Sequence, residues 1–530
     1  MGGALRYVTR GLLRARLVVA IAAVVFFSAL IAGRGAQPDT VAFSAPSQVF
    51  TFGRENSWIR VQNIGTAPAN VTVSYYNEAG QRIASDSCPG ARCPSMGPGQ
   101  GWTFFQGQHP GLPAGYQGSA VVEADQPIAA LQAKDVVRGN AFMIDGSTTS
   151  VAAGSHKMYL PLIANRDGPQ RDSMGRFVIQ NMGADTACVT ITYLSNYTDG
   201  EVHWDPYKPG TKNAPKQAGC PNGGRPIAPN GSLFRDPDTF GVPAGFTGSV
   251  RIDTHKTGEG VETNKQVLVA TADYWNTLYN LYSSYRALDE KEMSTTVNLP
   301  LVDREVGPFN GFSTRFQIVN KDPSKPAQVT VRFEGFDLAN GNAYVVKQHT
   351  MTVRGARLCF QDRDDFANCL APGDRLPFNF VGTARLTSTQ PIGVIVTRST
   401  RFGETFTNYR GFSPQEASTR VLLPVLNKNY GPVAGRAGWN SWFRVLVADG
   451  GTANVRIRYF GLDLPGGERS YTVTANREFT VFQFNEGFLP NGFAGTAILE
   501  SDRPIVALGN IYTDVFAGDT DLLYNGIPLP

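Results

Sequence analysis

Short stretches that alternate apolar and polar residues recur along the chain after residue 40. Val71–Tyr76 reads V-T-V-S-Y-Y, and the pattern returns at Val189–Tyr193, Val329–Phe333 and Val455–Tyr459. Successive side chains of a β-strand point to opposite faces, so a period of two predicts strands with one face in a core and one in water. Gly, Pro, Asn and Asp, which favour turns, lie between these stretches. The chain is therefore expected to consist of many short strands.

One turn followed by a strand is repeated four times. Its copies are Leu112–Val122, Val242–Val250, Leu376–Ala384 and Leu489–Ala497, and each begins with an apolar residue followed by proline. The proline presets φ for a turn, and the glycine or asparagine two residues later tolerates a positive φ. Repetition at a fixed place in a larger unit predicts four copies of one module.

Other strands recur around this turn in the same order. A strand with a bulky residue at or near its start precedes each alternating stretch and ends at Asn63, Asn181 and Asn320 in the first three copies. Three copies open with a strand built on Pro161, Pro300 or Pro424. The pattern predicts about seven strands per module, the layout of an antiparallel β-sandwich of immunoglobulin or fibronectin type. The predicted boundaries are 37–152 (module 1), 153–290 (module 2), 291–416 (module 3) and 417–530 (module 4).

Composition agrees with this fold class. Hydrophobic residues make up 42% of the 530 residues and aromatics 11%, which is enough to fill several cores. The net charge of +4 comes from five arginines among residues 1–36, a segment without acids. The remaining 43 basic and 44 acidic side chains nearly cancel, so no nucleic-acid partner is expected, because such binding needs a basic face.

The N-terminal segment, residues 1–36, has the pattern of an export signal. Leu17–Gly33 is a continuous apolar run that follows four arginines. Positive charge stays inside while the apolar run enters the membrane, so residues from about 37 onward are expected outside the cytoplasm. The run fits either a cleaved signal peptide or an uncleaved signal-anchor helix, and in the second case the membrane is a partner. The predicted location is therefore membrane-anchored or secreted.

Six cysteines fall in local pairs, each within one module. Such a set in an exported chain predicts disulfides rather than a zinc site, which would require four ligands gathered from Cys and His. The pairs are Cys88 with Cys93, Cys188 with Cys220, and Cys359 with Cys369.

With these motifs (bulky-x-I/V-x-N, V-T-V-x-Y and L-P-x-G-F-x-G) the chain resembles the tandem Ig-like β-sandwich repeat proteins of bacterial cell surfaces. The resemblance covers nearly everything after residue 40. It implies a secreted or surface-anchored array of modules used for adhesion, display or structural spacing. On this basis the prediction is a non-enzymatic protein that needs no cofactor.

A search for catalytic chemistry supports the same prediction. The five histidines are scattered, and the fingerprints of serine hydrolases, zinc peptidases, P-loop and dinucleotide-binding proteins do not occur. Two acidic groups, 362–365 and the set Asp514, Asp519 and Asp521, have the oxygen ligands that Ca²⁺ prefers but not the spacing of an EF-hand. They are interpreted as solvated turns rather than metal sites.

The longest insertion, residues 195–232, is the place where a ligand contact is expected. An exposed aromatic loop can stack on sugar rings, whereas insertion aromatics also commonly pack back on their own sheet. The alternative function is therefore carbohydrate binding through this loop, and a hydrolase with a site in one module is the third hypothesis. The candidate contact residues are Tyr197, His203, Trp204 and Tyr207.

Overall fold

A computed structural model of the chain describes residues 53–150, 154–167, 172–196, 202–204, 220, 224–236, 242–254, 266–307, 311–361, 369–371, 373–400, 405–431, 438–461, 464 and 468–529. The predicted export segment, residues 1–36, lies outside these ranges. The fold is all-β, with 67% of the described residues in strands and 3% in helix. The sheets are antiparallel, as the alternating pattern predicts.

Modules 1 and 2 contain the first seventeen strands. Those of module 1 are β1 (Arg54–Asn63), β2 (Val71–Asn77), β3 (Arg82–Cys88), β4 (Gly101–Phe105), β5 (Gly118–Ala124), β6 (Ile128–Arg138) and β7 (Ala141–Ser150), with the short helix η1 (Gln106–Gln108). Those of module 2 are β8 (Lys157–Asn165), β9 (Ser173–Asn181), β10 (Ala187–Ser195), β11 (Val202–Trp204), β12 (Arg225–Ile227), β13 (Ser232–Arg235), β14 (Phe246–Thr254), β15 (Leu268–Asn276), β16 (Leu281–Arg286) and β17 (Leu288–Asp289).

Modules 3 and 4 follow the same order, and each contains one strand of 20 or 21 residues. Those of module 3 are β18 (Ser294–Arg304), β19 (Phe312–Asn320), β20 (Ala327–Asp337), β21 (Ala343–Val353), β22 (Ala356–Cys359), β23 (Phe380–Thr400) and β24 (Phe406–Arg410), with η3 (Glu290–Glu292) before it and η4 (Pro414–Glu416) after it. Those of module 4 are β25 (Ser418–Lys428), β26 (Asn440–Val447), β27 (Thr452–Phe460), β28 (Glu468–Asn476), β29 (Glu478–Phe482), β30 (Phe493–Tyr512), β31 (Asp521–Asn525) and β32 (Ile527–Pro528), with η5 (Gln483–Asn485).

Each module pairs its strands in the same way and forms two packed sheets. The inner sheets have the orders β4-β1-β6-β7, β13-β9-β15-β16, β22-β19-β23-β24 and β29-β26-β30-β31. The outer sheets are β3-β2-β5, β11-β10-β14-β8, β21-β20-β23-β18 and β28-β27-β30-β25. In modules 3 and 4 the long strands β23 and β30 pass from the outer sheet into the inner one. Modules 3 and 4 thus contain one strand position more than the seven predicted from the turns.

The recurrent proline strand and the tyrosine of the last inner strand stabilise each other. Pairing of β8, β18 and β25 shifts register on either side of Pro161, Pro300 and Pro424, and this bulge leaves a carbonyl free of the ladder. A tyrosine hydroxyl donates to that carbonyl in each case: Tyr285 to Leu162, Tyr409 to Leu301 and Tyr524 to Val425. We refer to this contact as the tyrosine latch.

Removing one latch is expected to destabilise its module measurably. Tyr409 is buried, and its hydroxyl lies 2.5 Å from the oxygen of Leu301, so Tyr409→Phe leaves a buried carbonyl without a partner. We expect a loss of about 1–3 kcal/mol in the free energy of unfolding, measured by urea denaturation. The half-buried Tyr471, which packs against Phe488 at the periphery, offers a control, and Tyr471→Phe is expected to cost less. An equal loss of stability in the two variants would contradict a stabilising role of the tyrosine latch.

The asparagine that ends the second strand has a structural role in three modules. Nδ2 of Asn63, Asn181 and Asn320 donates to one carbonyl of the following loop (Ala67, Asp185 or Lys325) and to one further along the chain (Met96, Ile227 or Arg354). Oδ1 accepts a backbone N–H two residues on. Each asparagine thus ties the loop between the sheets to a second segment of its module.

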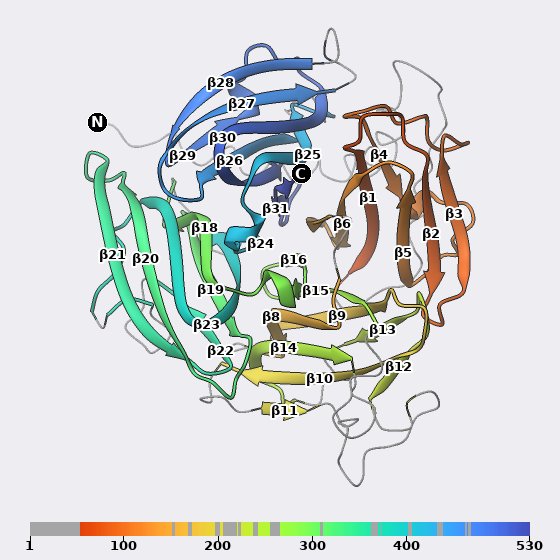
Figure 1. Cartoon of the computed structure of the whole chain (residues 1–530), viewed down its shortest axis with the longest axis horizontal. Helices are drawn as coiled ribbons and strands as arrows, with labels where there is room; N and C mark the ends of the chain where they lie inside the picture. Colours follow the sequence, from red (N-terminus) through yellow and green to blue (C-terminus); the bar gives the residue numbers. More distant parts are fainter. Residues whose placement is uncertain are drawn as a thin grey trace, which may run out of the picture.

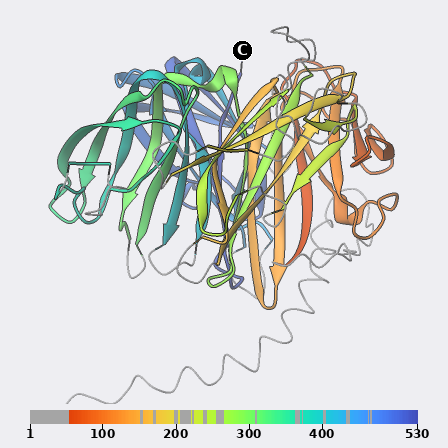
Figure 2. The same ribbon diagram turned by 90° about the horizontal axis from the view of Figure 1, so that it is seen from below.

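The four modules are arranged in a closed ring rather than in a line. Figure 1 shows the four groups of strands around a common centre, with module 4 beside module 1. The last inner strands, β7, β16, β24 and β31, meet there, and each contacts the one from each adjacent module. Figure 2 shows the strands running between the two faces of the ring. Between modules 2 and 3, the segment Tyr285–Met293 completes β16 and forms β17 and η3.

Candidate functional site

The centre of the ring is a polar cluster to which every module contributes. Asp519, in the connection between β30 and β31, has its Oδ2 atom 3.3 Å from the backbone nitrogen of Tyr282 and 2.9 Å from that of Phe406. Its own carbonyl accepts the backbone N–H of Ile144 at 2.9 Å. One residue of module 4 therefore binds the backbone of all three other modules.

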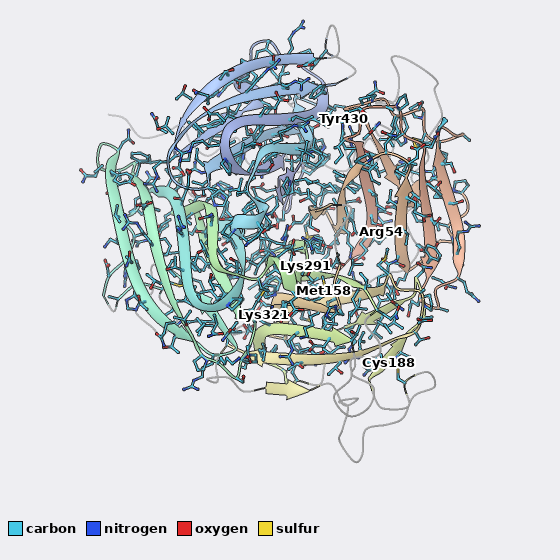
Figure 3. All side chains as sticks on the ribbon, viewed as in Figure 1. Arg54, Met158, Cys188, Lys291, Lys321 and Tyr430 are labelled. Carbon is cyan, nitrogen blue, oxygen red and sulfur yellow. A yellow bond between two sulfur atoms is a disulfide. The ribbon has the colours of Figure 1, made fainter. Side chains whose placement is uncertain are left out.

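Asp145 of β7 has a similar role from the side of module 1. Its carboxylate accepts hydrogen bonds from the hydroxyl of Ser283 at 2.5 Å, from the backbone of Ser284 at 3.1 Å and from the hydroxyl of Thr407 at 3.5 Å. Thr407 in turn accepts the backbone N–H of Leu523 in β31 at 2.8 Å. We call Asp145, Ser283, Thr407, Asp519 and Asp521 the axial cluster. In Figure 3 side chains fill the space between the central strands.

Burial raises the pKa of all three carboxyl groups of the axial cluster. The pKa of Asp145 and that of Asp519 are held well above the usual range, because removal from water penalises the charged form; neighbouring carboxylates add to this effect. The pKa of Asp521 is also raised by burial, against the attraction of Arg398, whose Nη1 lies 3.6 Å away. The carboxylates of Asp145 and Asp519 are hydrogen-bonded to hydroxyl and backbone groups of other modules. The cluster therefore joins modules by hydrogen bonds, and their strength depends on whether the carboxyl groups are ionised.

A ring of larger polar groups surrounds one end of this cluster. Asn525 of β31 exchanges two hydrogen bonds with the backbone of Arg410 and accepts one through its carbonyl from Thr148 at 2.6 Å. Arg286 and Arg410 both donate to Glu292. Although burial opposes ionisation, these two guanidinium groups lower the pKa of Glu292 to about 2. This end therefore links modules 2 and 3 by charge and modules 1, 3 and 4 by hydrogen bonds.

A buried charge network joins modules 1 and 2. Nζ of Lys134 lies 2.8 Å from Oδ2 of Asp273, and Nη2 of Arg176 lies 2.7 Å from the same oxygen. Arg176 also donates to both oxygens of Glu55 at 2.8 and 2.9 Å, and Tyr282 donates to the other oxygen of Asp273 at 3.0 Å. Burial alone would raise the pKa of Asp273, but the two cations outweigh it and hold the pKa well below its usual range.

A histidine and an aspartate also lie together inside module 1. Nε2 of His109 is 3.6 Å from Asp86, and its Nδ1 accepts the backbone N–H of Gly111 at 3.0 Å. Tyr75 donates to Asp86 and accepts from Gln106. Module 4 repeats the last contact, with Gln483 donating to Tyr459. Because Nδ1 binds the turn of His109 itself, Nε2 faces β3 at Ser85 and Asp86, and the contact of tyrosine with glutamine recurs in module 4, we interpret this pair as part of the frame.

Two of the four ligand-contact candidates lie on the edge strand of one outer sheet. His203 and Trp204 belong to β11, which pairs with β10 in the register Tyr193 with His203 and Thr192 with Trp204. Tyr197 and Tyr207 lie outside the described residues. The structure thus brings two of the four onto one edge strand, far in sequence from the axial cluster.

The cysteines pair as their spacing predicts. Disulfides join Cys88 to Cys93, Cys188 to Cys220 and Cys359 to Cys369, and all six residues are buried. Figure 3 places Cys188 on the outer side of module 2. Each disulfide therefore cross-links a loop within a single module, and none of the three joins two modules.

The interpretation of Asp519 and Asp521 as members of a solvated turn is wrong. Both are buried, since the connection that carries them inserts between the central strands, where Ala517 bridges to Ala141 of module 1. Within the described ranges no group of three or more His, Cys, Asp or Glu residues is placed to bind a metal ion. The other acidic group, 362–365, lies outside them. No helix in the described part of the chain is long and apolar enough to cross a membrane.

Comparison with known proteins adds no further identification. No protein-family model and no curated protein matches the chain.

Proposed function

We propose that the protein is an exported, non-enzymatic component of the cell surface or envelope, secreted or tethered by its N-terminal segment, that acts in adhesion, display or envelope structure. The observation that carries the proposal is the closure of four like modules around the axial cluster. The buried ionisable groups at the centre hold modules to one another, and β11 and β12 of the module 2 insertion lie in its outer sheet. A rigid frame with added strands on its outside suits repeated weak contacts with a surface.

We propose further that each module is an immunoglobulin-like sandwich in which the edge strand of one sheet has moved to the other sheet. An immunoglobulin domain pairs its second strand with its fifth and its third with its sixth. The same pairings occur in module 3, as β19 with β22 and β20 with the first half of β23. The first strand, β18, lies beside the sixth rather than the second. These pairings support kinship of architecture with the immunoglobulin type.

Export is supported by the arginines and apolar run of residues 1–33 and by the three disulfides. Cell fractionation with N-terminal sequencing of the exported protein tests this. We expect the protein in the envelope or medium with its cysteines oxidised. Recovery in the cytoplasm with free thiols would contradict the proposal. A start near residue 37 would identify a cleaved signal, whereas an intact start would identify an anchor.

The alternative proposal is carbohydrate binding by the module 2 insertion. It is supported by the position of β11, which carries His203 and Trp204, at the edge of the outer sheet. A glycan array probed with the exported part tests it, using Trp204→Ala as the variant and Trp442→Ala, at the boundary of modules 3 and 4, as the control. Retention lost only with Trp204→Ala would favour carbohydrate binding, and no retention on any glycan would exclude this alternative.

A further inference from the structure

The outer sheet of module 1 lacks a strand that the other three modules have. In modules 2, 3 and 4 the first strand pairs along the strand that follows the repeated turn: β8 with β14, β18 with β23 and β25 with β30. Among the described residues, the outer sheet of module 1 has the order β3-β2-β5 and ends at β5. One edge of β5 therefore presents main-chain donors and acceptors that, within the described part of the chain, have no ladder partner.

The core side of β5 is also less buried than the matching strands of the other modules. In the complete modules the leucine of the first strand (Leu160, Leu299 or Leu423) has 0% of its surface exposed, and so has the apolar residue two positions past its strand partner (Ile252, Leu386 or Leu499). The corresponding residue of β5 is Val122, which is only partly buried, as is Ala120 beside it. The edge of β5 is thus both unpaired and apolar on its core side.

Module 1 also lacks the tyrosine latch. The latch tyrosines Tyr285, Tyr409 and Tyr524 pair with Ala272, Val396 and Gly509, and the same ladder position in module 1 pairs Gln132 with Ser147. The hydroxyl of a serine is too short to reach across the sheets. Module 1 is therefore built to receive a first strand that has no proline bulge.

We propose that the free edge of β5 binds a β-strand and that its occupant is residues 40–45 of the same chain, T-V-A-F-S-A. Three features of this segment support it. It alternates bulky apolar residues with small or polar ones, it has no proline, and Val41 stands 18 residues before Ile59. In modules 2, 3 and 4 the buried leucine stands 17, 17 and 20 residues before the residue equivalent to Ile59 (160 to 177, 299 to 316 and 423 to 443), so Val41 matches the leucine position within that range.

The proposal uses ordinary strand addition. An extended segment gains main-chain hydrogen bonds along the edge, while its alternate side chains enter the core. Val41 and Phe43 would cover Ala120 and Val122, and Ala42 and Ser44 would face outward. A long, uncovered apolar edge invites pairing with other chains, so occupation by the protein's own segment also protects the ring from association.

Hydrogen–deuterium exchange of the full chain, followed in the peptide that contains Gly118–Ala124, tests the proposal. Val41→Asp with Phe43→Asp places two charges in the core, and we expect exchange of β5 to accelerate by at least about tenfold. The matched control, Ala42→Asp with Ser44→Asp, adds the same charge to the outward face and is expected to change the rate by less than about twofold. Exchange in β19 of module 3 reports whether the ring remains folded.

A second variant keeps the test decisive if the double substitution unfolds module 1. Deletion of residues 38–46 is expected to expose β5, and a synthetic peptide of that sequence is expected to restore its protection. Unchanged exchange of β5 in both variants would overturn the proposal. Protection that depends on protein concentration, together with dimers in sedimentation, would also overturn it by identifying a second copy as the occupant.

Discussion

Replacing Asp273 by alanine is expected to destabilise the ring more than any other single substitution at a module boundary. The change leaves Lys134 and Arg176 buried without their shared carboxylate, and removing one partner of a buried pair costs about 3–5 kcal/mol. Tyr282, which donates to the same side chain, also loses its acceptor. Urea unfolding followed by intrinsic fluorescence measures the loss, with Trp275 as a reporter inside this boundary.

An exposed ion pair provides the control for this experiment. Asp449 pairs with Arg503 on the surface of module 4, where solvent screens the charges. Asp449→Ala is therefore expected to cost less than about 1 kcal/mol. A similarly small effect of Asp273→Ala would mean that modules 1 and 2 are not joined by this network.

Raising the pH from about 4 to 8 is expected to weaken the ring through the axial cluster. Asp145, Asp519 and Asp521 have pKa values raised above 3.8, so the unfolded chain releases protons that the folded chain retains. The stabilisation from these groups is fully present below the pKa that they have in the unfolded chain. It is lost as the pH rises through their pKa in the folded chain. Thermal unfolding across this range measures the loss as a midpoint temperature that falls with rising pH.

Other carboxyls give the opposite dependence at lower pH. The pKa of Glu292 is lowered to about 2 from 4.5, so its contribution is present above pH 4.5 and is lost as pH falls toward 2. Stability is therefore expected to be highest near pH 4–5. Asp145→Asn should flatten the alkaline slope, whereas Asp502→Asn at the exposed surface should leave it unchanged. A slope that Asp145→Asn does not alter would place the pH dependence elsewhere.

The repeated features were predictable because each is decided within one module. The alternation of Val329–Phe333, the turn at Leu376 and the cysteine pairs depend on neighbours in sequence or on a single core. The structure confirms the strands and the pairs. The strand of Pro300 and the tyrosine Tyr409, which bonds to Leu301 of that strand, both recur in modules 2, 3 and 4, although nothing in their spacing indicated contact.

Ring closure and the axial cluster were not predictable from the repeats. The residues that join modules differ at every boundary: Lys134 with Asp273 between modules 1 and 2, and Arg398 with Asp521 between modules 3 and 4. A comparison of repeats treats such positions as variable surface. Asp519 lies in a stretch of Gly, Asp and Thr that has the composition of an exposed turn, and its burial comes entirely from other modules.

The contact between modules 1 and 4 has a consequence for the order in which the protein folds. Thr148 and Asn525 are 377 residues apart, whereas strands within a module pair over short distances in sequence. Contacts of such separation bear the largest loop-closure entropy and form late. During synthesis β7 gains its neighbour β31 only after module 4 has been made. A chain that stops short of module 4 would leave Ile144 without its backbone partner, so ring closure waits for that module.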